Sequence, residues 1–136
     1  MWKINKSDID NHISNFATAG YILPASIANW PGNGNTANGE MALLAPYFDV
    51  NLNDKYDPQN GDYPLIRGNQ AIFFIFNDDK VPHSSGAVKM GIEVHGMAYS
   101  FSNLSDSALN HAVFVNYEIY NRSSNNYNDV YLGSWA

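Results

Sequence analysis

Alternating apolar and polar positions in the second half of the chain predict a β-sheet. Residues 91–101 alternate, with Ile92 and Val94 on one side and Glu93 and His95 on the other. Residues 111–121 alternate as well, and the apolar side chains that share one side there are Val113, Val115, Tyr117 and Ile119. Residues 70–76 form a continuous apolar and aromatic run, which is typical of a strand buried on both faces.

A last strand is predicted at residues 127–135. The turn-rich segment 121–126 precedes it, so we expect the strands at 111–121 and 127–135 to form an antiparallel hairpin. Because this last strand ends at the end of the sequence, its open edge could pair with another copy of the chain. A terminal strand also leads us to expect that the chain is part of a longer, C-terminally truncated protein.

The first part of the chain has a different pattern. Ser7, with Asp10 three residues later, is a capping signature, and Ile9 and Ile13 follow at helical spacing, which predicts a short helix over residues 8–15. Residues 24–29 allow one more helical turn, with proline at the first helical position. Residues 30–40 are loop by composition, and residues 41–48 read as a strand.

These elements predict a single, mainly β domain over residues 1–136. Its lead-in, residues 1–40, contains the short N-terminal helix and a loop. Residues 41–136 form an antiparallel β-sandwich or jelly roll.

The amino-acid composition limits the classes of partner and the cellular settings that fit this chain. The net charge of −6, with only seven Lys and Arg residues, argues against a nucleic-acid partner, because phosphates require a basic face. The longest apolar run, residues 71–76, is too short for a transmembrane segment. The chain has no cysteine, so a bound metal is one of the remaining means of stapling a small secreted domain.

The segment 49–64 is rich in side-chain oxygens at every second position, which is the layout of a loop that wraps Ca²⁺. The expected ligands are Asp49, Asn51, Asn53, the Lys55 carbonyl, Asp57 and Asp62. Asp54 stands where such loops usually carry glycine, but aspartate tolerates the left-handed conformation. The alternative is a loop of turn residues that binds no metal.

Glu93 and His95 share one side of a strand and, with His111 from another strand, could form a His/His/Glu metal site. The simpler interpretation, which we favour, is a half-buried His95 that is hydrogen-bonded across the sheet. The chain lacks the common hydrolase and phosphate-binding motifs.

The many aromatic residues allow a second kind of site. Aromatic faces beside Asn and Asp can bind sugar rings, and the candidate ligand-binding residues are Trp30, Tyr99, His95 and Glu93. Core packing is the competing interpretation for most of these aromatic side chains.

Several spaced motifs resemble a region of large secreted or cell-surface proteins of Bacteroidota that are exported by the type IX secretion system. The motifs are NWPGNGN at 29–35, LAPYFDVN at 44–51, YDPQNGDYP at 56–64, RGNQAIF at 67–73, GIEVHGMAY at 91–99 and NRSS at 121–124. The resemblance implies a location outside the cell, but no defined biochemical role is known for this region. Similar sequences tend to carry Asp and Gly where this chain has Asn53 and Asp54.

The sequence therefore predicts a non-catalytic, Ca²⁺-stabilised structural or adhesive module of a secreted or surface protein. Two alternatives remain open. One is a carbohydrate-binding module with a glycan partner, and the other is a metal-dependent hydrolase built on His95, His111 and Glu93.

Overall fold

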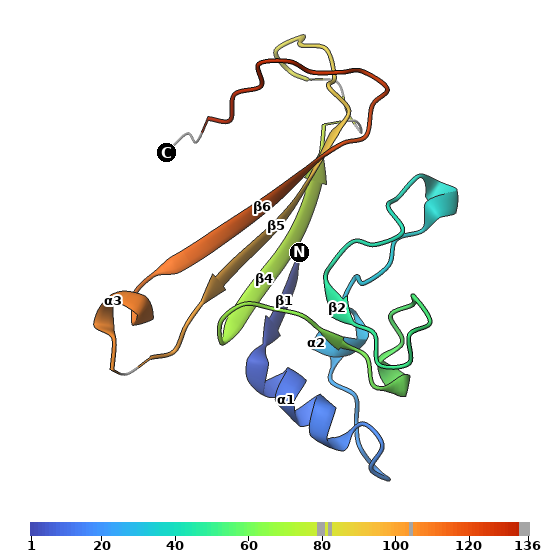
Figure 1. Ribbon diagram of the computed structural model, residues 1–136, viewed down its shortest axis with the longest axis vertical. Coiled ribbons are helices and arrows are strands. Elements are labelled where there is room, and N and C mark those ends of the chain that lie inside the picture. The colour runs from blue at the N-terminus through green and yellow to red at the C-terminus, as the bar shows by residue number, and fades with distance from the viewer. Residues whose placement is uncertain (79–80, 82, 104, 134–136) are drawn as a thin grey trace.

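Four antiparallel strands form the main sheet, in the order β1–β4–β5–β6 (Figure 1). The computed structural model describes residues 1–78, 81, 83–103 and 105–133. The strands of the main sheet are β1 (Trp2–Asn5), β4 (Gln70–Asn77), β5 (Ile92–Ser100) and β6 (Val113–Asn121). A second, two-stranded sheet pairs β2 (Tyr47–Phe48) with β3 (Tyr63–Pro64). The helices are α1 (Lys6–Asn15), α2 (Ala25–Ala28) and α3 (Ser107–Asn110), with two 3₁₀ turns at Thr36–Asn38 and Pro58–Asn60.

One face of the main sheet carries the core. Because directly paired residues point to the same side, Ile4, Ala71 and Tyr99 share this face, as do Trp2, Phe73 and Met97. We call it the covered face, since α1, α2 and the loop region before β4 pack on it (Figure 1). The buried apolar cluster consists of Ile4, Ile9, Ile27, Trp30, Ala45, Ala71, Phe73 and Tyr99.

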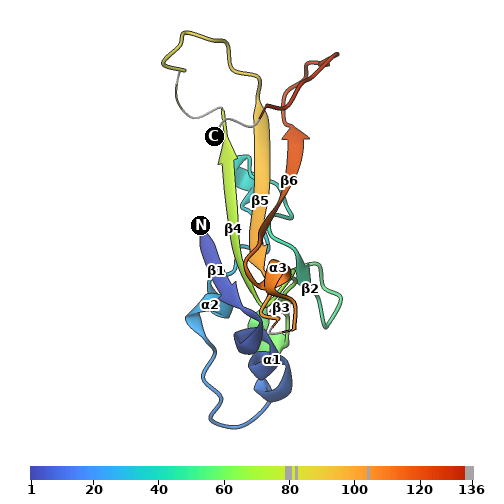
Figure 2. The same ribbon diagram turned by 90° about the vertical axis from the view of Figure 1, so that its left-hand side faces the viewer.

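Among the described residues, no helix or strand packs over the middle of the opposite face of β4, β5 and β6. Figure 2 views the three strands from this side, with α3 near their lower ends. We call it the open face, and it is formed by Ile72, Phe74, Phe76, Val94, Gly96, Ala98, Val113, Val115, Tyr117 and Ile119. The expectation that residues 70–76 are buried on both faces is therefore wrong. Ala71 and Phe73 are buried, but Phe76 on the other side is 54% exposed.

The mainly β, antiparallel character and the short N-terminal helix are confirmed. The helix begins at Lys6 rather than residue 8, and Asn5 stands at its N-cap without a side-chain cap bond, so the predicted role of Ser7 is wrong. The strand β1 was not predicted; only four residues long, it pairs with Gln70–Phe73 of β4.

Two further element predictions are wrong. Of residues 41–48, only Tyr47 and Phe48 form a strand. Residues 127–133 form no strand, and residues 134–135 lie outside the described part. The predicted terminal hairpin is therefore not seen in the described residues, and β6 is the strand at this edge of the sheet. At this end of the sheet, the edge available for self-association is that of β6 and not that of residues 127–133, while β1 forms the other edge.

Within the described part of the chain, no helix has the length and apolar character needed to cross a membrane.

Candidate cation site and neighbouring cavity

The oxygen-rich loop connects β2 and β3, which bring its two ends together. Tyr47 pairs with Pro64 and Phe48 with Tyr63. The Phe48 and Tyr63 rings stack with centroids 5.1 Å apart and planes 15° from parallel. Two aromatic residues at the loop ends therefore fix its closure, and the loop between them folds on its own polar side chains.

Asp62 holds the two halves of this loop together from inside. Its side chain is fully buried. Oδ1 accepts a hydrogen bond from the Val50 N–H at 2.8 Å, and Oδ2 accepts one from the Asp57 N–H at 2.9 Å. Burial raises the pKa of Asp62 above its usual value, against the lowering effect of these two N–H groups. Asp62, predicted as the closing ligand, already uses both oxygens to brace the backbone.

Asp57 is the point on which the amide side chains converge. Oδ2 accepts hydrogen bonds from the side-chain amides of Asn60 at 2.8 Å and Asn53 at 3.0 Å, and Oδ1 accepts one from Asn51 at 3.3 Å. The bond from Asn60 is the largest cause of the lowered pKa of Asp57. The structure thus brings together three of the predicted ligand residues and adds Asn60, which was not among the predicted ligands.

Asp49 forms a hydrogen bond across the first half of the loop with one carboxylate oxygen, and its other oxygen has no partner among the described residues. Oδ2 accepts a hydrogen bond from the Asp54 N–H at 2.7 Å. Oδ1 is buried, and no described residue bonds to it. Asp54 adopts φ 61°, as predicted for the position where glycine is usual, and Leu52 is also left-handed at φ 59°. An unpaired buried carboxylate oxygen beside this turn is the feature that a bound cation would explain.

Lys55, the remaining predicted ligand, comes directly after Asp54 in the sequence. Its N–H donates to Asn53 Oδ1 at 2.8 Å, so residues 53–55 form a tight polar turn. Among the described residues, no group of three His, Cys, Asp or Glu side chains is placed to hold a metal ion. A cation in this loop would therefore depend on amide and carbonyl oxygens as well as on the carboxylates.

Tyr56 of the loop, together with residues 32–33 outside it, fastens the loop to the core. The Tyr56 hydroxyl donates to the Ile27 carbonyl at 2.7 Å, and burial followed by the Asp62 charge raises the pKa of Tyr56. Asn33 Oδ1 accepts from the Tyr56 N–H at 2.6 Å. Gly32 packs against Tyr56 so closely that a Cβ atom there would lie 2.5 Å from the Tyr56 Cβ. The NWPGNGN motif is thus the platform of the loop, a role that its sequence alone did not reveal.

A second site lies on the covered face at His95. Its Nε2 is 2.8 Å from Glu93 Oε1, the ring is only 3% exposed, and Nδ1 has no partner among the described residues. A cavity of about 250 Å³ lies beside it. Its walls include Leu44, Ile66, Arg67, Phe73, Asn116 and Glu118.

The other predicted residues are not assembled around His95. His111 lies at the end of α3, where its Nδ1 is 2.7 Å from the Ser107 carbonyl oxygen. Trp30 and Tyr99 are core residues with exposed fractions of 3% and 9%. Glu93 and His95 therefore meet as a pair, the metal triad does not form, and the aromatic platform proposed on Trp30 and Tyr99 is wrong because both rings are buried.

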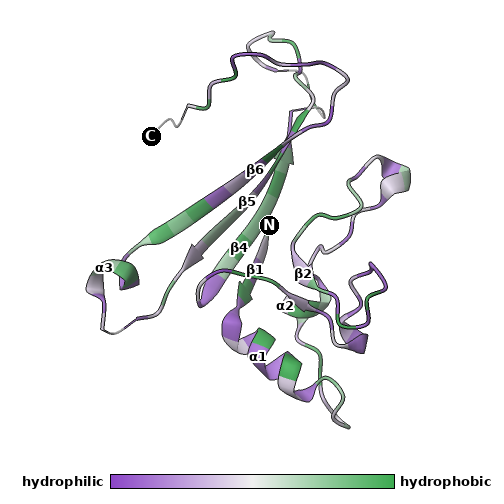
Figure 3. Ribbon diagram, viewed as in Figure 1, coloured by the Kyte–Doolittle hydropathy of each residue, from purple (hydrophilic) through white to green (hydrophobic). Residues whose placement is uncertain are grey.

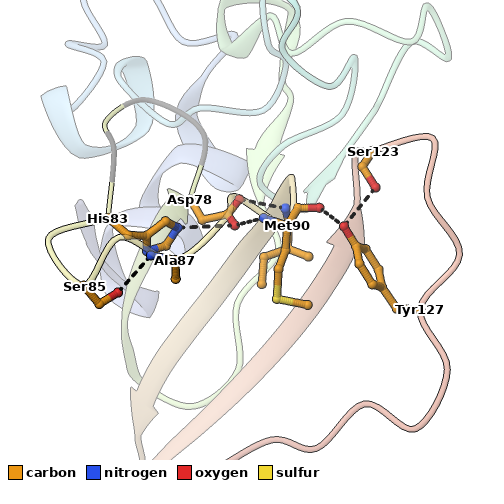
Figure 4. Close-up of polar contacts among 8 residues, drawn as sticks. Asp78, His83, Ser85, Ala87, Met90, Ser123 and Tyr127 are labelled. Carbon is orange, nitrogen blue, oxygen red and sulfur yellow. Dashed lines mark hydrogen bonds and ion pairs between the residues drawn. The ribbon is translucent and has the colours of Figure 1, made fainter.

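Asp78 fixes the connection between β4 and β5 (Figure 4). Its carboxylate accepts hydrogen bonds from the N–H groups of Met90 at 2.6 Å and Ile92 at 2.9 Å, and His83 Nε2 lies 3.8 Å away. The Tyr127 hydroxyl donates to the Met90 carbonyl from the other side. Burial acts to raise the pKa of Asp78, but the backbone N–H groups outweigh it and lower the pKa overall. This cluster braces the connection between β4 and β5.

No protein-family model, no curated protein and no solved structure matches this chain.

Proposed function

We propose that this chain is a non-catalytic structural or adhesive module that Ca²⁺ stabilises through the loop between β2 and β3. The observation that carries the proposal is the buried Oδ1 of Asp49, which has no hydrogen-bond partner among the described residues. A buried anionic oxygen without a partner costs several kcal/mol, and a cation removes that cost.

The loop supplies further oxygens for such an ion. Rotating the amide of Asn51 by 180° would turn its oxygen toward the Asp57 carboxylate and allow a cation to replace this hydrogen bond, whereas Asn53 Oδ1, which accepts the Lys55 N–H, would offer its second lone pair. With Asp49, Asp57 and the Lys55 carbonyl, these amides would provide the oxygen-rich set that Ca²⁺ prefers, with water completing it. Asp62 would act as the buried support behind the ligands.

Such a ligand set supports a location outside the cell. Two carboxylates and neutral oxygens give weak sites, and weak Ca²⁺ sites with dissociation constants of about 10⁻⁴–10⁻³ M are typical of extracellular modules. The resemblance to type IX-exported proteins of Bacteroidota points to the same compartment. The finer architecture that we propose is the β-sandwich or jelly roll, completed when a second layer covers the open face.

The test is thermal unfolding in Ca²⁺ and in EGTA, with Mg²⁺ as the ionic control. We expect Ca²⁺ alone to raise the midpoint, by a free energy of about 2.7 kcal/mol at a hundredfold excess over the dissociation constant. Asp49→Asn should abolish the shift. Asp10→Asn, which removes an exposed carboxylate on α1, is the matched control and should keep it. A midpoint that is equal in Ca²⁺ and EGTA would refute the metal site.

A second candidate function is the binding of a small sugar in the cavity beside His95. The unpartnered Nδ1 of His95 favours it, because Nε2 donates to Glu93 and leaves Nδ1 to accept a hydroxyl proton. Asn116 and Glu118 add polar groups to apolar walls, which is the usual composition of a small-molecule pocket.

Titration of isotope-labelled protein with a panel of monosaccharides, followed by NMR, tests this second function. Binding should perturb the signals of His95 and Asn116. His95→Leu should weaken it at least tenfold, whereas Lys3→Met on the opposite side of the sheet should not. If no sugar shifts these signals, the pocket is not a carbohydrate site.

A further inference from the structure

The open face is a continuous apolar surface on a protein with a net charge of −6. Figure 3 shows hydrophobic residues along β4 and in much of β6. The exposed fractions are 54% for Phe76, 72% for Val113, 43% for Val115, 59% for Tyr117 and 42% for Ile119. None of the described residues that β4, β5 and β6 present on this side is charged. An alternating strand normally turns such side chains toward a core.

The centre of the open face is flat and held in place. Phe74 pairs with Gly96 across the β4–β5 ladder, and Gly96 pairs with Tyr117 across β5–β6. The Phe74 ring lies over Gly96, where a Cβ atom would come within 2.2 Å of it. Phe74 stacks on Phe76 with planes 8° apart and meets Tyr117 edge to face. These contacts order the aromatic rings before any partner arrives, which lowers the entropic cost of association.

The size of the surface matches what a stable interface needs. The exposed surface of the five most exposed side chains on this face is about 500 Å². This estimate multiplies each exposed fraction by a full side-chain area of roughly 150–250 Å², the range for aromatic side chains. A monomer rarely exposes more than this in one patch. Two such faces in contact would bury about 1,000 Å² from these side chains alone, which is where specific interfaces begin.

The chemistry of the face favours a second copy of this chain over other occupants. A sugar would find few polar groups there, chiefly the hydroxyls of Tyr117 and Ser100, and Lys3 only at the margin, beside Ile72 on β1. Interfaces between different proteins carry polar and charged groups that select the partner, whereas homodimer interfaces are more apolar. The described residues of β4, β5 and β6 on this face carry no charge, so two copies stacked about a two-fold axis bring no like charges together there; Lys3 lies beside this area, on the short edge strand β1.

We propose that two copies of this chain dimerise by stacking their open faces, so that their two sheets form a β-sandwich about a two-fold axis. The sheets would lie about 10 Å apart with strand directions within about 30° of each other. The β2–β3 loop takes no part in this contact, so the proposal stands independently of Ca²⁺ binding.

Sedimentation equilibrium or light scattering over a range of protein concentrations tests the proposal, with Ca²⁺ present throughout. The wild-type protein should have twice the mass of one chain, with a dissociation constant in the micromolar range. Tyr117→Lys should weaken the dimer about a hundredfold, because the substitution buries two unpaired charges. Asn116→Lys places the same charge on the covered side of the same strand, and this matched control should leave the dimer intact.

A second variant separates stacking from pairing of strand edges. Phe76 lies on β4, two strands away from the edge strand β6, so Phe76→Lys should break a stacked dimer and leave a dimer that pairs through the β6 edges intact. Circular dichroism checks that each variant is folded, and the wild-type mass is informative even if a variant does not fold. A wild-type protein that stays monomeric at about 100 μM, or a dimer that Phe76→Lys leaves unchanged, would overturn the proposal.

Discussion

The Nε2 atom of His12 lies 3.1 Å from the carbonyl oxygen of Asp62, a contact that ties the first helix to the end of the oxygen-rich loop. The His12 ring is fully buried. With Nε2–H donating to this carbonyl, Nδ1 is left to accept the Tyr21 hydroxyl at 3.0 Å. The neutral ring therefore satisfies both contacts, and a protonated ring would lose its acceptor.

This arrangement predicts acid sensitivity below neutral pH. Burial lowers the pKa of His12 below 6.5, against weaker opposing effects from Asp62. Because the folded pKa is depressed, the stability that this group contributes is present above pH 6.5 and is lost as the pH falls through the folded pKa. Urea unfolding at pH 7.5 and 5.5 should show the loss. His12→Gln should flatten the dependence in this window, whereas the exposed His111→Gln should leave it unchanged.

Removing the Asp62 carboxylate should loosen the whole loop. Asp62→Ala leaves the part-buried N–H groups of Val50 and Asp57 without acceptors, which costs about 2–6 kcal/mol at roughly 1–3 kcal/mol for each unsatisfied group. Asp62→Asn keeps one acceptor oxygen and should cost less. Denaturant titration measures both variants. Equal, small losses for the two would mean that the carboxylate does not brace the loop.

Gly96 should not tolerate a side chain. In Gly96→Ala the new Cβ would start 2.2 Å from the Phe74 ring, and displacing that ring should cost about 1–3 kcal/mol of stability. Gly133→Ala is a matched control, since no atom lies within 4 Å of a Cβ at that position. Thermal unfolding distinguishes the two. If Gly96→Ala were as stable as the control, the flat packing of Phe74 would be incorrect.

Asp78 should control the order of the β4–β5 connection. Its lowered pKa means that its contribution to stability is present above pH 3.8 and is lost as the pH falls through the folded pKa. Asp78→Ala should accelerate amide hydrogen exchange at Met90 and Ile92, which lose their acceptor, while amides in the middle of β5 exchange as before. Unchanged exchange at Met90 and Ile92 would contradict this role.

Much of the sheet follows from local pattern. The alternation in residues 91–101 and 111–121 gives β5 and β6 within two residues, and the apolar run at 70–76 gives β4. The strand β1 has only four residues, too few for a periodic signal, and it exists because β4 offers it a ladder partner. Residues 127–133 have strand-like composition but no strand beside them to pair with in the described structure.

The candidate loop shows the same division. Its oxygen spacing predicted that Asn51, Asn53 and Asp57 would meet, and Asp54 adopts the left-handed conformation that aspartate tolerates. Spacing alone could not show that both carboxylate oxygens of Asp62 accept hydrogen bonds from backbone N–H groups. It also could not show that Oδ1 of Asp49 has no hydrogen-bond partner among the described residues. Hydrogen-bond partners depend on which backbone groups the fold brings near, and residues as distant as His12 and Asn33 take part.

The sequence by itself determined the antiparallel strands, the N-terminal helix and the polar loop, because periodicity and turn chemistry act over a few neighbouring residues. Only the tertiary structure decided which side of each strand is buried. Alternation separates two faces without saying which one meets the core, so Val113, Val115, Tyr117 and Ile119 were correctly grouped but lie on the open face. Burial depends on the packing of distant segments, and here α1, α2 and the loop region cover only the other side.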